Sequence, residues 1–289
     1  MPLARTRWPT YWRLIGFALC LCMTMRLALA QDFDIARIGK LDVDAQARWL
    51  ADAADDGTLD DDRLTQLFRA LDPLAVPRYL QNGKHDYVSY EFTMRRRERI
   101  KGVWPKRADH MLVRVTHEPL RIYAKWLPDG AHAGQEILYD DAKRPDQIYG
   151  HLGGWLRVMP MWTSIDGSLA RAQSNHSIRE LGIDTITQRF LDEGQKFAEA
   201  GVTKPSKNIE VREIGGVRVV AFTYETPTGQ PEFYAKKEIL GLDLKRPLFR
   251  AVESFDNDGN IFESVVFEQI EEKTFDDLTF DPKNPEYRF

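Results

Sequence analysis

The chain has 289 residues, a formal net charge of -4 at pH 7 and only two cysteines. Four of its 40 basic residues and none of its 44 acidic residues fall in the first thirty positions, so the rest of the chain carries a net charge near -8. A chain this acidic is not expected to bind nucleic acid.

The N-terminus has the pattern of a cleaved export signal. Arginines precede an apolar run from Leu14 to Met25, and Ala28-Leu29-Ala30 offers the small residues that signal peptidase accepts before Gln31. The run is shorter than the roughly 20 apolar residues that cross a bilayer core. We therefore expect residues 1–30 to be a signal peptide and residues 31–289 to form a single periplasmic domain.

Both cysteines, Cys20 and Cys22, lie within this signal. The mature chain is then free of thiols, which excludes disulfides, cysteine catalysis and cysteine-based metal sites.

Two short amphipathic helices are expected at the start of the mature chain, within residues 42–72. Apolar residues recur at helical spacing behind Asp42 and again behind Asp60-Asp61-Asp62. Asp72-Pro73 is expected to end the second helix.

From Tyr87 the hydrophobic period changes to two, which predicts strands. In the stretch from Glu118 to Gly130, for example, Leu120, Ile122 and Trp126 share one face and polar residues share the other. Six strands are predicted in this first block, within residues 87–95, 111–116, 118–130, 135–140, 145–151 and 155–161.

The alternation stops between Ser168 and Gly201, where apolar residues return to helical spacing, so an inserted helical segment is expected at 168–201. A second block of five strands follows, within residues 208–214, 217–224, 231–240, 248–254 and 260–270. Gly215-Gly216 and Asn257-Asp258-Gly259 are predicted hairpin turns, because these residues tolerate positive φ.

The order of elements is helices, meander, helix, meander. Short connections without βαβ alternation predict an α+β fold that is mainly antiparallel β. About eleven strands are too many to stay flat without curling. We expect a curved half barrel with helices on its concave face.

No catalytic constellation is evident in the sequence. The motifs of serine hydrolases, zinc proteases, phosphate loops and dinucleotide folds are missing, and the six histidines share no ligand spacing. The histidines lie near predicted turns and strand ends, where solvent exposure is expected. Asp256 to Asn260 resembles the start of a calcium loop, but a hairpin turn explains it better. We expect no enzyme activity, no cofactor and no metal.

Large apolar residues recur at period two on several strands, and together they would line the inside of the curved sheet. Core packing explains each of them singly. If the helices do not fill the concavity, the same residues form an apolar pocket of the kind that accepts acyl chains. The predicted cavity residues are Phe92, Met94, Val113, Ile122, Trp126, Val265 and Phe267.

A run of arginines follows Met94, and on a strand Arg95, Arg97 and Arg99 share one face. Surface carboxylates can neutralise such a strand end at little cost. The functional alternative is contact with a phosphate or a lipid headgroup. With Arg121 and Lys125, these arginines are the predicted headgroup contacts.

Four segments together carry a family resemblance: Tyr90 to Gly102, Leu120 to Trp126, Gly134 to Tyr139 and Asp277 to Phe289. They resemble the bacterial domain-of-unknown-function family fifteen seventy-one, a relative of the LolA and LolB lipoprotein-carrier fold. The resemblance implies a half barrel that holds acyl chains, or that senses lipoprotein or lipopolysaccharide as relatives of the sensor RseB do. A resemblance to a known fold family is stronger evidence for the fold than for the function.

The leading hypothesis is a periplasmic lipid- or lipoprotein-binding carrier that holds acyl chains in the concave apolar face. Its partners would be a lipid or lipidated protein and proteins of the inner or outer membrane. The alternative is a non-enzymatic envelope interaction or sensing module with a packed core, in which Arg114, Tyr123 and Lys125 form the contact surface. A hydrolase of envelope glycans has no constellation in its favour.

Overall fold

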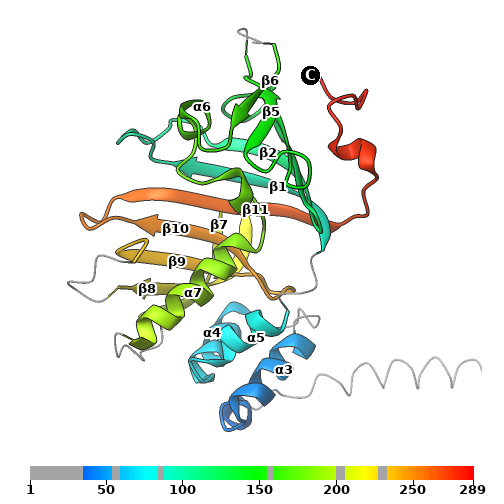
Figure 1. Ribbon diagram of the computed structural model, residues 1–289. Coiled ribbons are helices and arrows are strands. Elements are labelled where there is room, and N and C mark those ends of the chain that lie inside the picture. Colours follow the sequence, from blue (N-terminus) through cyan, green and yellow to red (C-terminus); the bar gives the residue numbers. More distant parts are fainter. Residues whose placement is uncertain (1–34, 54–58, 84–87, 155–158, 200–205, 227–232) are drawn as a thin grey trace, which may run out of the picture.

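The computed structural model describes residues 35–53, 59–83, 88–154, 159–199, 206–226 and 233–289 (Figure 1). The predicted signal peptide and Gly201, the expected end of the inserted segment, lie outside the described residues. Among the helices that are described, none combines the length and the apolar character needed to span a bilayer.

Eleven strands form one open antiparallel sheet in the order β6-β5-β4-β3-β2-β1-β11-β10-β9-β8-β7. Two meanders therefore meet where β1 pairs with β11. This confirms the predicted α+β, mainly antiparallel fold of about eleven strands. The strands are β1 (Ser89–Glu98), β2 (Asp109–His117), β3 (Leu120–Trp126), β4 (Glu136–Asp140), β5 (Gln147–His151), β6 (Met161–Ser164), β7 (Asn208–Ile214), β8 (Val217–Glu225), β9 (Lys237–Leu242), β10 (Phe249–Phe255) and β11 (Ile261–Glu272).

Both predicted hairpin turns are confirmed by their backbone conformation. Gly215 and Gly216 have φ of 57° and 86° between β7 and β8, and Gly259 has φ of 77° between β10 and β11. These left-handed conformations are the ones that tight hairpin turns require and that glycine adopts without strain.

Two strands differ most from their predicted limits. The strand expected at 155–161 is β6, which begins at Met161, and residues 155–158 lie outside the described part. Pro160 directly before it has no N–H for pairing. The strand expected at 231–240 is β9, which begins later and continues through Gly241. A Cβ at Gly241 would lie 2.7 Å from Cγ2 of Val219, so glycine fits where a side chain would not.

In the described part of the chain, four helices precede the sheet: α2 (Ile35–Ile38), α3 (Val43–Ala53), α4 (Asp61–Ala70) and α5 (Ala75–Asn82). Asp60 caps α4 by accepting a hydrogen bond from the Arg63 backbone N–H. The short α2 and the last helix, α5, were not predicted. Pro77 lies in the first turn of α5, a position where proline is tolerated, and so it does not prevent the helix.

The N-terminal helices pack against the inner face of the sheet, which we define as the face that carries the large core with Phe92, Phe222 and Phe249. Phe68 on α4 meets Phe222 edge to face at 5.6 Å. Arg69 donates a hydrogen bond to the backbone oxygen of Ile209 at 3.0 Å, so α4 covers the β7 edge.

The described part of the inserted segment is helical in three pieces, the short α6 (Ser168–Arg171), the 3-10 helix η1 (Ile178–Glu180) and the longer α7 (Thr185–Glu199). Helix α7 crosses β8, β9 and β10 (Figure 1), and Phe190 packs on Phe249 at 4.9 Å. The chain between α6 and η1 passes over the ends of β1 and β11, where it contacts the sheet through Ser174, Asn175 and His176.

The opposite, outer face of the first meander is covered by the C-terminal segment, residues 275–289, which includes η2 (Asp277–Phe280). Tyr287 stacks on Tyr123 of β3 with ring centroids 3.9 Å apart. Tyr123 is consequently only 2 % exposed, although the strand pattern predicted a polar face there.

We expect Tyr287→Ala to destabilise the protein by about 3 kcal/mol, the typical cost of truncating a buried aromatic residue. The free energy of unfolding in urea measures this effect. Glu286→Ala is the control, because that side chain is 70 % exposed, and its effect should stay within about 0.5 kcal/mol. Equal effects of the two variants would show that the C-terminal segment does not hold the outer face.

Candidate ligand-binding pocket

A pocket of about 330 Å³ lies between the inner face of the first meander and the segment from α6 to α7. This volume is in the range of sites that bind small molecules. Strands β1 to β6 and β11 form its floor, and α6, η1 and the start of α7 form its roof.

The strand register determines which side chains of the floor lie next to each other. Phe267, Met94, Met111 and Trp126 lie side by side on β11, β1, β2 and β3, and the Trp126 backbone N–H donates to the backbone oxygen of Gln135 at 2.9 Å. Because alternate residues of neighbouring strands point to the same face, these side chains form one largely apolar row. We call it the apolar row.

One end of the pocket is ionic. Two residues beyond Met94, Arg96 lies opposite Asp109 of β2, and two residues further Glu98 lies opposite Glu263 of β11. Charged groups here are nearly buried: the side chains of Arg96 and Glu98 are 11 % and 3 % exposed. The apolar row therefore changes to charged side chains along the same strands.

The other end is apolar and reaches the surface beside β6 and α6. Met159, Met161 and Leu169 line the pocket there and are 82 %, 44 % and 45 % exposed. Exposed apolar residues grouped at one place mark a contact with an apolar partner more often than scattered ones do. We call these three residues the mouth.

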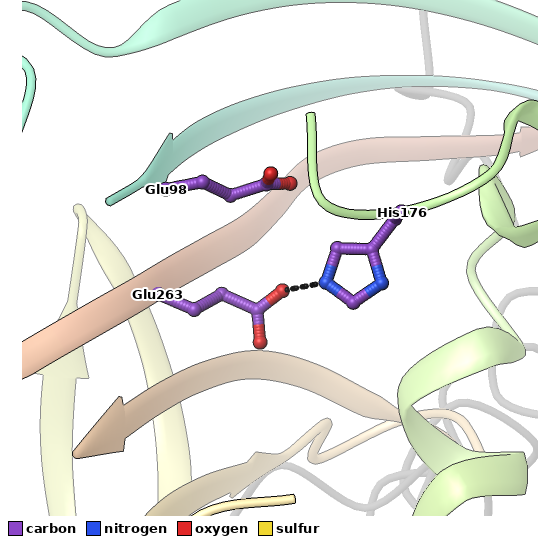
Figure 2. Close-up of side chains that lie close together, drawn as sticks. All are labelled: Glu98, His176 and Glu263. Carbon is purple, nitrogen blue, oxygen red and sulfur yellow. Dashed lines mark hydrogen bonds and ion pairs between the residues drawn. The ribbon is translucent and has the colours of Figure 1, made fainter. Parts of the chain in front are cut away.

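Glu263 is the centre of the ionic end. Its carboxylate accepts hydrogen bonds from His176 at 2.8 Å, Tyr234 at 3.1 Å and Arg189 at 3.2 Å. Figure 2 shows His176 reaching from the roof toward Glu263, with Glu98 beside them. The four residues come from β11, the inserted segment and the loop before β9, so the network joins roof to floor.

Glu98 makes a second link between roof and floor. It accepts hydrogen bonds from the Ser174 hydroxyl at 3.1 Å and from the Asn175 backbone N–H at 2.8 Å. Arg96 lies 3.4 Å from the same carboxylate and also donates to Asp109. The chain between α6 and η1 is held down by these contacts.

The buried charges shift each other's pKa values. Burial opposes the charged form of His176, but hydrogen bonds to Glu180 and Glu263 outweigh it and raise its pKa to about 9. Burial likewise opposes ionisation of Glu263, yet His176 and Arg189 lower its pKa to about 2. Glu238, buried with less compensation, has a pKa raised to about 7. At neutral pH, His176 is an imidazolium bound to an ionised Glu263.

Glu98, His176 and Glu263 each offer one ligand atom, and these atoms lie within 4.8 Å of one another. Two carboxylates and an imidazole are a common donor set for transition metals. Here Arg96 and Arg189 already lie against the two carboxylates, and both ring nitrogens of His176 are engaged, Nδ1 with Glu180 and Nε2 with Glu263. We assign the cluster to ion pairing.

Sequence reasoning missed this cluster, because His176 and Glu263 lie 87 residues apart and share no motif. The prediction that the histidines are exposed was wrong for His151, which is 7 % exposed, and His176 has a side chain only 18 % exposed. That prediction placed strand ends and loops in solvent, whereas the inserted segment and the C-terminal segment cover them.

The predicted cavity residues divide into two groups. Met94, Trp126, Val265 and Phe267 line the pocket. The other three, Phe92, Val113 and Ile122, are at most 1 % exposed and belong to the packed core beside it.

The predicted headgroup contacts, Arg95, Arg97, Arg99, Arg121 and Lys125, are not among the residues that line the described pocket. Most have carboxylate partners elsewhere: Arg95 with Glu268 at 2.6 Å, Arg99 with Asp256 at 2.5 Å, Arg121 with Asp277 at 2.7 Å and Lys125 with Glu136 at 3.5 Å. Arg97 lies opposite Ser264 of β11. Within the described part of the chain, the cations that line the pocket are Arg96, Arg189 and the imidazolium of His176.

Fold and pocket together define a β-sheet protein with a ligand-sized, partly apolar internal site. The model of the family described as "Protein of unknown function (DUF1571)" matches residues 87–289, and the chain belongs to this family. The match begins after the N-terminal helices. No curated protein matches the chain at a significant level.

Several solved structures resemble the chain, including the following three. An uncharacterized conserved protein from Thermus thermophilus is 8% identical, with 71% of this chain and 93% of that chain covered and a TM-score of 0.38. The Pseudomonas aeruginosa MucA/MucB complex matches at 14% identity, 68% and 56% coverage and a TM-score of 0.35. A LolA superfamily protein from Nitrosomonas europaea matches at 8% identity, 73% and 98% coverage and a TM-score of 0.28. Similarity at this level carries no functional argument.

The raised pKa of His176 predicts a pH-dependent stability. Since the ordinary pKa is 6.5, the stabilising contribution is complete below pH 6.5 and is lost as the pH rises through about 9. Its upper limit is on the order of 3 kcal/mol. The free energy of unfolding in urea, measured on both sides of this pH window, should fall less with rising pH for His176→Gln than for the wild type. Parallel pH profiles would contradict the assigned role.

Proposed function

We propose that the chain is a non-enzymatic binding or carrier protein of the periplasm, which holds the acyl chain of a lipid or lipidated molecule in this pocket. The observation that carries the proposal is the pocket itself, in which an apolar row leads from an ionic end to an exposed apolar mouth.

Apolar burial would drive binding. Each methylene group that leaves water for an apolar wall contributes about 0.8 kcal/mol. Met94, Met111, Trp126 and Phe267 offer such a wall, and methionine adapts its shape to irregular guests. We place the acyl tail against this wall, between the ionic end and the mouth.

The alternative, an interaction module that uses the outer face, has less support. Tyr123 is covered by Tyr287, Arg114 is paired with Glu91 at 2.7 Å, and Lys125 lies 3.5 Å from Glu136. The residues expected to form that contact surface are thus engaged within the chain itself.

A bulky residue in the roof tests the proposal. Ala170 on α6 lines the pocket, so Ala170→Trp should weaken binding of a fluorescent fatty-acyl probe at least tenfold by filling the space of the tail. Ala172 caps the same helix but does not line the pocket, and Ala172→Trp is the matched control. Probe fluorescence gives the affinity, and native mass spectrometry of the purified protein detects bound lipid.

A wild-type protein that neither binds the probe nor retains lipid would refute the proposed function. So would equal affinities of the two tryptophan variants, because binding would then occur outside the pocket.

A further inference from the structure

Two polar atoms in the pocket wall, Nε1 of Trp126 and Oε1 of Gln135, are buried without a hydrogen-bond partner in the described part of the chain. Their residues are only 4 % and 6 % exposed. A buried polar atom without a partner costs about 1–3 kcal/mol, so such atoms are rare and call for an explanation.

The two residues are neighbours on the floor. Trp126 ends β3 and Gln135 directly precedes β4, and the Trp126 backbone N–H donates to the Gln135 backbone oxygen at 2.9 Å. Trp126 lies at the end of the apolar row, opposite Met111. Both side chains therefore adjoin the wall against which we placed the acyl tail.

The chemistry of each atom is determined by its group. The indole Nε1 carries a hydrogen and can only donate. Gln135 uses its Nε2 to donate to Oε1 of Gln173 at 2.9 Å, which leaves its own Oε1 as an acceptor. These two neighbouring residues of the wall thus carry one donor and one acceptor, neither of them used by the residues that the structure describes.

His151 also lines the pocket and has an unpartnered buried atom, Nε2, but its ring is set apart from the apolar row. The ring of His151 meets Phe289 of the C-terminal segment at 5.7 Å, and the residue pairs with Glu136, whose carboxylate accepts from the Arg288 backbone N–H. These contacts tie the imidazole to the outer face, whereas the apolar row lies on the inner one.

We propose that the pocket recognises an acyl chain attached through a secondary amide, with the amide carbonyl accepting from Trp126 Nε1 and the amide N–H donating to Gln135 Oε1. The inference rests on the proposed acyl-chain binding and adds the linkage to it. A secondary amide has one acceptor and one donor in a neutral group, which matches the wall. An ester lacks the donor, and an ionised carboxylate would set negative charge against Gln135 Oε1.

Sites built around a hydrogen bond reject analogues that lack it, because the protein group is then left unpaired. The distinction can be measured with ligands of equal chain length. N-methyldodecanamide has both groups, N,N-dimethyldodecanamide and methyl dodecanoate have only the acceptor, and dodecane has neither. Affinities come from displacement of the fluorescent acyl probe from the full mature chain.

We expect N-methyldodecanamide to bind about tenfold more tightly than N,N-dimethyldodecanamide and methyl dodecanoate. Trp126→Phe keeps an aromatic ring but removes the donor, so it should weaken both amides and the ester about tenfold more than it weakens dodecane. Gln135→Met removes the acceptor. Its expected effect is limited to the secondary amide, which should lose its advantage over the tertiary amide and the ester. Retained dodecane binding shows that each variant is folded.

If all four ligands bind with the affinity expected from their hydrocarbon content, the amide inference is overturned and acyl-chain binding stands. The same conclusion follows if Trp126→Phe weakens dodecane as much as the amides. If dodecane and the amides all fail to displace the probe, the pocket does not take acyl chains, and both proposals fall.

Discussion

The structure depends on the pairing of β1 with β11, which places two carboxylates, Glu98 and Glu263, opposite each other on the inner face. Like charges on directly opposed residues destabilise a sheet, and buried ones must be compensated. Arg96, Arg189 and His176 supply the compensation, and His176 and Arg189 come from the inserted segment. The ion pairs that compensate these two buried carboxylates therefore also hold the roof over the sheet.

This anchoring explains why the inner face is filled unevenly. Toward β8 and β10 the apolar side of α7 packs directly on the sheet, with Phe190 against Phe249 and Tyr224. Toward β5 and β6 the roof is the irregular chain from α6 to η1, which is held by polar contacts at the ends of β1 and β11. Because polar contacts hold this part of the roof, it does not cover the whole floor with apolar side chains. Residues such as Met94 and Met111 therefore line a pocket.

The outer face obeys a different constraint. A sheet with one covered face usually exposes the other, and the alternation in β3 predicted that outcome. Instead the C-terminal segment covers the first meander through Phe280 and Tyr287, and Arg121 lies over the Phe280 ring at 4.7 Å. Four of the five cations that were predicted to meet lipid headgroups are paired with carboxylates outside the pocket. The pocket takes its positive charge from Arg96 of β1 and from Arg189 and His176 of the inserted segment.

The sequence by itself determined the local features. Period-two alternation located nearly every strand, Gly215-Gly216 and Gly259 identified the hairpins, and Met94, Trp126, Val265 and Phe267 were correctly assigned to an inward face, because such patterns depend only on neighbouring residues. Only the tertiary structure decided which faces were covered and where space remained. The contact of His176 with Glu263 joins residues that are 87 positions apart. The unpartnered atoms of Trp126 and Gln135 are unpartnered because no hydrogen-bonding group of the described residues reaches them. Such properties arise from packing between distant segments, which no local pattern records.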